Sequence, residues 1–295
     1  MHAKVLEHYR QFDSFTYPGP YQDQLRLLPD DIRELGLLVR KSLIHCTTLV
    51  AGNTGTNQDL RFGDMTQMPW YRQPEDDVFQ TAAAMLAELY RRDARGIIGD
   101  RKVEDKLVLT CRYTAILMAS ILKSKGIPAR VRAGHADYFE EGTNTSSDHW
   151  INQYWNGEEQ RWITIDVDGS LSLVKHFDPY DMPDCIFDFP GPAWVAVRSG
   201  KIDPLRFWNA KPERGSLVLL WSLFYDFHCL MNHEIPYVHG PKWASSHHFA
   251  NLSPKQLSQI DRLAQLLCDP DGNFDELKQL WDSAKEFRIL TGGLL

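Results

Sequence analysis

Cysteine, basic charge and long apolar runs are all scarce in this chain. Its 295 residues include 5 scattered cysteines and no Cys-x-x-Cys pair, which argues against a disulfide scaffold and favours a reducing compartment. The 32 basic residues are outnumbered by 39 acidic ones, so the chain lacks the basic surface with which a nucleic-acid-binding protein neutralises phosphates. The longest apolar run, Leu217–Tyr225, contains Ser222 and is far shorter than the roughly 20 residues of a membrane span.

The N-terminus also lacks a feature, the apolar stretch of a secretory leader. Together these absences predict a cytoplasmic protein that binds neither nucleic acid nor membranes. What is present is the composition of an ordinary folded protein, with 43% hydrophobic and 24% charged residues. No internal repeat divides the chain.

Segments with helical periodicity flank a central group of segments rich in aromatic and β-branched residues. Asn156 and Gly157 occupy a turn between two of these central segments, which predicts an antiparallel hairpin. The pattern indicates an α+β protein with an N-terminal helical and loop segment over 1–72, a core over 73–190 and a helical extension over 191–295. The expected helices are 30–45, 74–92, one from Cys111, 217–231, one capped by Ser253, and 275–287; the expected strands are 129–133, 149–155 and 162–167.

The helix that begins at Cys111 is the most informative segment. Thr110 is suited to be its N-cap, and Gly126 followed by Pro128 ends it. A thiol in the first turn of a helix loses its proton more readily, because the helix dipole and the N–H groups there favour the thiolate. Cys111 is therefore a candidate nucleophile.

A nucleophilic thiolate also needs a proton-transferring partner and a group that orients this partner. His149 begins one strand of the expected hairpin and Asp166 ends the other, so pairing of the strands can bring imidazole and carboxylate together. Asp168 lies on the same strand face as Asp166 and is the alternative carboxylate. Arg130 and Arg132 alternate with small apolar residues, which predicts an exposed strand face.

Over about residues 105–170, this order of motifs resembles the transglutaminase-like superfamily. The resemblance rests on Cys111 at a helix N-terminus, the run from Gly126 to Val131, and Asp166 four residues after Trp162. It also includes His149 with Asn152 three residues later. The superfamily pattern often has Gly two residues before the cysteine and Pro after the aspartate, where this chain has Leu109 and Val167.

The resemblance implies a fold related to papain, with the nucleophile helix packed on an antiparallel sheet. It implies that Cys111 is the nucleophile, His149 the general base and acid, and Asp166 the residue that orients the imidazole. Trp70 and Asn152 are the implied oxyanion or substrate-pocket residues. The expected activity is acyl transfer from an amide or thioester donor, through an acyl-thioester on Cys111, to water or an amine. We expect no metal or other cofactor.

Two other functions remain open at this stage. One is a binding module that keeps the fold without catalysis. The other is a metal-dependent hydrolase that uses the C-terminal histidines, although Tyr237 stands where an HExxH motif would place its second histidine. The histidines in question are His228, His233, His239, His247 and His248.

Overall fold

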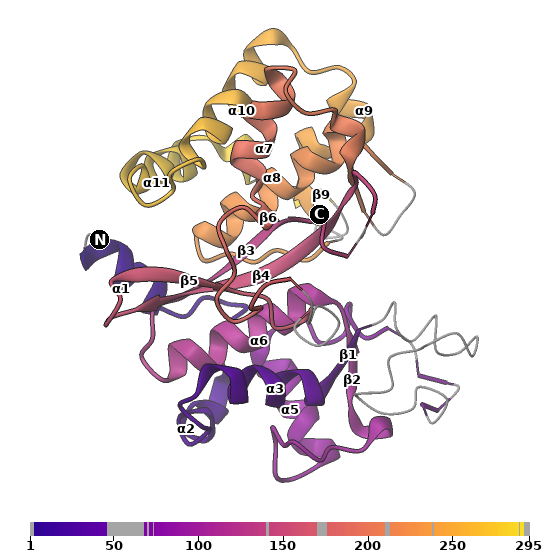
Figure 1. Ribbon diagram of the computed structural model, residues 1–295, viewed down its shortest axis with the longest axis vertical. Coiled ribbons are helices and arrows are strands. Elements are labelled where there is room, and N and C mark those ends of the chain that lie inside the picture. The colour runs from indigo at the N-terminus through magenta and orange to yellow at the C-terminus, as the bar shows by residue number, and fades with distance from the viewer. Residues whose placement is uncertain are drawn as a thin grey trace. The chain divides into compact units, whose positions relative to one another are not determined.

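The computed structural model describes residues 3–45, 68–69, 71–72, 74–139, 142–169, 176–209, 213–237, 239–288 and 290–291 (Figure 1). Helices and an antiparallel sheet together make an α+β protein, as the sequence predicts. None of the helices in these ranges has the length and apolar character that crossing a bilayer would require.

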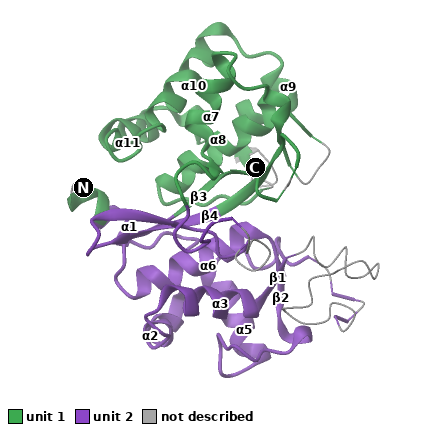
Figure 2. Ribbon diagram, viewed as in Figure 1, with its two compact units in different colours: residues 1–6, 131–150, 183–295 green, residues 7–130, 151–182 purple. Residues whose placement is uncertain are grey.

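Two compact units divide the chain (Figure 2). Unit 1 contains residues 1–6, 131–150 and 183–295, and unit 2 contains residues 7–130 and 151–182. Each unit is therefore assembled from separate stretches of sequence. The division into 1–72, 73–190 and 191–295 stays a prediction.

Unit 2 is built around one fully buried helix, α6 (Cys111–Ser124). Its end is a Schellman motif, in which Gly126 N–H donates to the Lys123 carbonyl and Ile127 N–H to the Leu122 carbonyl. Gly126 adopts φ +78°, a conformation that costs residues with a Cβ atom. The predicted helix end is thus confirmed. The elements packed on α6 are α2 (Gln22–Arg26), α3 (Ile32–Ser42) and α5 (Ala82–Arg92), accompanied by α1 (Ala3–Arg10), which begins in unit 1, and short 3-10 turns at Gly19–Tyr21 and Val103–Asp105.

Two predicted helices of unit 2 have different bounds in the structure. The helix expected over 30–45 ends at Ser42, because the next three residues form strand β1 (Leu43–His45). This strand pairs in parallel with β2 (Leu107–Leu109). The helix expected over 74–92 begins only at Ala82.

One five-stranded sheet contains β3 (Ala129–Ala136), β4 (Ser146–Asn156), β5 (Arg161–Ile165), β6 (Phe187–Asp188) and β7 (Phe207–Trp208). Its order is β5-β4-β3-β6, with β7 beside β4. The predicted hairpin is confirmed: β4 and β5 are antiparallel, with Asn152 opposite Ile165 and Asn156 opposite Arg161.

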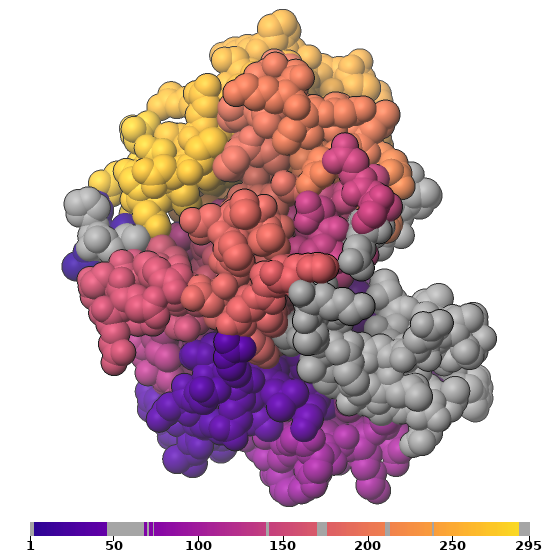
Figure 3. All heavy atoms as spheres, viewed as in Figure 1, coloured from indigo at the N-terminus to yellow at the C-terminus, as the bar shows by residue number. Residues whose placement is uncertain are grey.

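The helical part of unit 1 packs α7 (Pro190–Arg198) against both α8 (Ser216–Leu230) and α10 (Pro254–Leu266). Gly191 permits close approach of α7, since a Cβ atom there would lie 2.8 Å from the Leu267 side chain and 2.9 Å from the Ala264 carbonyl. A capping box of Ser253 and Gln256 begins α10, as predicted, and α10 and α11 lie at the surface (Figure 3). The bounds are α7 Pro190–Arg198, α8 Ser216–Leu230, α9 Ser246–Phe249, α10 Pro254–Leu266, α11 Phe274–Ser283, β8 Gly240–Pro241 and β9 Leu290–Thr291, with 3-10 turns at Pro204–Arg206, Lys242–Ala244 and Lys285–Phe287.

Candidate functional site

Cys111 is the first residue of α6, and its side chain is buried with 6% of the residue exposed. Thr110 occupies the N-cap position, but its side chain does not cap the helix. Instead, its N–H and hydroxyl both donate to Oδ1 of Asp76, at 2.9 and 3.1 Å. The hydroxyl of Tyr113 donates to the Asp76 carbonyl at 2.6 Å. Asp76 therefore fixes the turn that presents Cys111.

A histidine that the sequence analysis did not single out contacts Cys111. His45 ends β1, where it pairs with Leu109, two residues before the cysteine. Its side chain is hydrogen-bonded to Cys111, and its Nε2 lies 3.7 Å from Oδ2 of Asp168. Burial lowers the pKa of His45, but the Asp168 carboxylate and the hydrogen bond to Cys111 raise it by more, so the pKa lies above its ordinary value.

Asp168, the alternative carboxylate of the sequence analysis, is held by two groups besides His45. Nη1 of Arg40 lies 3.0 Å from its Oδ1, and these two side chains are only 8% and 9% exposed. The Thr114 hydroxyl donates to the same oxygen at 3.3 Å. Asp168 thus links α3, β1 and α6 at the position of the cysteine.

Asp166 directly follows β5 and is completely buried. Its Oδ1 accepts a hydrogen bond from the Gly169 N–H at 2.8 Å, and its own N–H donates to the Pro179 carbonyl at 2.8 Å. Both bonds hold the residue in a fixed orientation. Cys111 and Asp166 both belong to unit 2.

His149 lies on β4 with 3% of the residue exposed, and it belongs to unit 1. Two aromatic rings meet its imidazole edge-on, with centroids at 4.8 Å for Phe139 and 6.4 Å for Tyr138. Such packing restricts the orientation of the ring. The approach of His149 to Cys111 and Asp166 stays a prediction.

Of the two implied oxyanion or pocket residues, the structure describes Asn152 but not Trp70. Asn152 lies on β4, buried, and its Nδ2 donates to the Ala115 carbonyl of α6 at 2.9 Å. This amide therefore connects the sheet to α6. Trp70 lies outside the described residues, so its role stays a prediction.

The C-terminal histidines engage protein groups in unit 1. His228 Nε2 bonds the Phe287 carbonyl at 2.9 Å, and its Nδ1 lies 3.1 Å from Nδ1 of His233. His248 Nδ1 bonds the Ser245 hydroxyl at 2.7 Å. Burial lowers the pKa of His228 to about 3. Within the described ranges, no group of three or more His, Cys, Asp or Glu side chains is arranged to hold a metal ion.

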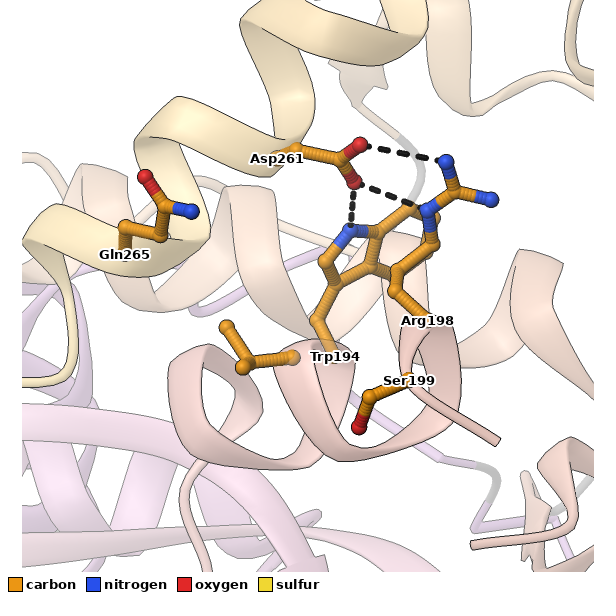
Figure 4. A pocket seen from close by; sticks show the side chains of 6 residues that line it. Trp194, Arg198, Ser199, Asp261 and Gln265 are labelled. Carbon is orange, nitrogen blue, oxygen red and sulfur yellow. Dashed lines mark hydrogen bonds and ion pairs between the residues drawn. The ribbon is translucent and has the colours of Figure 1, made fainter. Parts of the chain in front are cut away.

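A surface pocket of about 270 Å³ lies in unit 1 between α7 and α10 (Figure 4). Asp261 accepts hydrogen bonds there from Trp194 Nε1 at 2.8 Å and from the Arg198 guanidinium at 3.0 and 3.1 Å. The Asp261 carboxylate is thus hydrogen-bonded to Trp194 and Arg198 within the pocket. No cysteine is among the described residues that line this pocket.

Comparison with known families identifies one segment of the chain. Residues 102–167 match the model of the transglutaminase-like superfamily. The matched range runs through β2, α6, β3, β4 and β5 and contains Cys111, His149 and Asp166. Neither the curated proteins nor the solved structures gave a match. The segment is thus transglutaminase-like, and this likeness suggests cysteine-dependent acyl transfer or hydrolysis.

Proposed function

We propose that this protein is a cysteine-dependent acyl-transfer enzyme with Cys111 as the nucleophile. The family match over 102–167 is the observation that carries the proposal. The position of Cys111 supports it, because a thiol at the N-terminus of a buried helix is stabilised as the thiolate by the helix dipole.

The reaction has two halves. The Cys111 thiolate attacks the carbonyl carbon of an amide or thioester, and the bond to the leaving amine or thiol breaks as the acyl-thioester forms. His149 gives the leaving group its proton and then takes one from the water or amine that releases the acyl group. Asp166 orients the imidazole. Donors of this class are proteins, peptides or small molecules.

The tetrahedral intermediate places negative charge on the former carbonyl oxygen. N–H groups at the start of α6 are suited to stabilise this charge, since they form the positive end of the helix dipole and Cys111 is the first residue of the helix. The Asn152 amide donates one of its two N–H groups to the Ala115 carbonyl, and Asn152 stays a proposed oxyanion or substrate-pocket residue. Trp70 is kept as a proposed oxyanion donor.

Acylation of the thiol tests the proposal directly. The protein is mixed with a p-nitrophenyl ester and a small-molecule thioester, and the acyl group is located by peptide mass spectrometry. We expect one acyl group on Cys111 in the wild type and none there in Cys111→Ala. His149→Ala should slow acylation by roughly 10²-fold or more.

Cys185→Ala is the matched control, since Cys185 is exposed and outside the proposed site. This variant should be acylated at Cys111 as fast as the wild type. A wild type that stays unmodified at Cys111, or is modified only at exposed cysteines, would overturn the proposal. That result would favour the non-catalytic binding module.

A further inference from the structure

Cys111 is hydrogen-bonded to His45, a histidine to which the family resemblance assigns no role. His45, Asp168, Arg40 and Thr114 surround the first turns of α6, and all of them belong to unit 2 together with Cys111. We propose that His45 accepts the Cys111 thiol proton in the resting enzyme and holds the thiolate, with Asp168 as its counter-ion. The inference rests on the proposed function, and it adds a second imidazole to that site.

Backbone pairing holds the imidazole at this position. β1 and β2 are parallel, with Leu43 opposite Leu107 and His45 opposite Leu109. All three leucines are buried, with at most 1% of each exposed. This pairing fixes the position of His45, the last residue of β1. Its partner Leu109 lies two residues before Cys111, so His45 is held beside the start of α6.

The charges around His45 suit a thiolate and an imidazolium. Asp168 lies between His45 and the buried Arg40 guanidinium. With the proton on His45, the row of thiolate, imidazolium, carboxylate and guanidinium alternates in sign, and buried charges are tolerated when they are paired in this way. The Asp76 carboxylate, which precedes α5, also interacts with His45. Among the described residues, the charged and titratable groups that interact with His45 include Cys111, Asp168, Arg40 and Asp76.

The step itself moves one proton. The Sγ–H bond of Cys111 breaks and an N–H bond forms on His45, with no oxidation, reduction or further reactant. When the sulfur is acylated it loses its negative charge, while the His45 imidazolium keeps Asp168 as its partner. This leaves His149 to serve the leaving group, so the two histidines have separate tasks.

The pH dependence of Cys111 alkylation separates these tasks. Iodoacetamide labelling is followed at the Cys111 peptide by mass spectrometry in wild type, His45→Gln and His247→Gln. Glutamine can still form hydrogen bonds, but it cannot take up a proton. We expect a wild-type midpoint below the value of about 8.5 for a free thiol, and a midpoint higher by about one pH unit or more in His45→Gln.

His247 is exposed on α9, so its replacement should leave the midpoint unchanged. An unchanged midpoint in folded His45→Gln would overturn the inference. If the wild type is acylated at Cys111 while the midpoint does not move in His45→Gln, the proposed function stands and the role of His45 is wrong. If the wild type is not acylated, the proposed function fails instead.

A second measurement leaves His45 in place, in case its replacement prevents folding. Nitrogen-15 imidazole spectra of His149→Gln are recorded before and after Cys111 is blocked by methylthiolation. Over a pH series, we expect one imidazolium to lose its proton at a pH lower by about one unit or more in the blocked protein, because the thiolate that stabilises it is gone and only Asp168 remains as its partner. Spectra that do not change would overturn the inference.

Discussion

Arg132 and Asp226 form a buried pair of opposite charges in unit 1. Arg132 on β3 donates through Nε and a terminal nitrogen to Asp226 on α8, at 2.7 and 2.8 Å, and both side chains are almost inaccessible. The Ala133 N–H donates to the same carboxylate at 3.2 Å. Removing one partner of such a pair leaves the other charge buried without compensation.

Asp226→Asn should therefore lower the free energy of unfolding by about 3–5 kcal/mol. The double variant Arg132→Met with Asp226→Leu should recover most of this loss, because no charge is then buried. Urea unfolding measures both. Asp181→Asn is the control: Asp181 also pairs with an arginine through two bonds, but both side chains are 44% exposed, so its loss should cost under about 1 kcal/mol. Equal costs at the two aspartates would contradict this interpretation.

The sequence analysis was wrong to place Arg130 and Arg132 on an exposed strand face. Both are 3% exposed. Arg130 donates to Gln153 at 2.8 Å and lies over the Trp162 ring at 4.2 Å. Alternation along a strand shows which residues share a face, but the groups that pair with a buried arginine lie on other elements and leave no local pattern.

At the scale of elements, the bounds of α6 were predicted well because its start and end depend on neighbouring residues. Cys111 begins it, and Gly126 follows its end with φ +78° and nothing within 4 Å of an added Cβ atom. Only the backbone conformation, and no steric contact, therefore opposes a side chain at Gly126.

Gly126→Ala should destabilise the protein by about 1–2 kcal/mol, the cost of the left-handed conformation for a residue with a Cβ atom. Gly157→Ala provides the comparison, since Gly157 also has open space around it but no positive φ; its change should stay within about 0.5 kcal/mol. Thermal or urea unfolding distinguishes the two. A cost at Gly126 no larger than at Gly157 would show that the turn adapts to the new residue.

Elements whose identity depends on distant partners were not predicted. Leu43 and Ile44 continue a helical apolar pattern, yet they form a strand because Leu107 and Val108 pair with them. Glu75 and Asp76 were expected in the first turn of a helix, but their carboxylates accept N–H groups of Val108 and Thr110. His45 was missed for the same reason, since its partners Cys111 and Asp168 follow it by many residues.

At the scale of the whole molecule, the histidines with shifted pKa values differ between the units: the pKa is lowered for those in unit 1 and raised for the one in unit 2. Burial lowers the pKa of His135 to about 3, and that of His228 also to about 3; both lie in unit 1. The unfolded chain binds protons at these residues below about pH 6.5 while the folded chain does not, so stability falls as the pH drops from there toward 3. The pKa of His45 in unit 2 is raised, so its contribution to stability is complete at low pH and is lost as the pH rises through the raised pKa.

Acidification from pH 7 to pH 5 should therefore destabilise unit 1 more than unit 2. Each buried neutral histidine should lower the free energy of unfolding by about 2 kcal/mol over this pH interval. Hydrogen exchange of α8 and α6, corrected for the intrinsic effect of pH, measures the two units separately. His135→Phe should reduce the acid-induced loss of protection in α8 by the contribution of one histidine, whereas His247→Gln should leave that loss unchanged. Equal loss of protection in both helices would contradict the prediction.

The division of the chain between the units also sets an order of events during synthesis. Unit 2 is complete once residue 182 has been made, whereas unit 1 requires residues up to the C-terminal helices. Asp226 follows Arg132 by 94 residues, which a ribosome takes on the order of 10 s to translate. The surroundings of Cys111 within unit 2 can thus form on the nascent chain before Asp226, the counter-ion of Arg132, has been synthesised. The unit that contains Cys111 is therefore complete before the core of unit 1 can close.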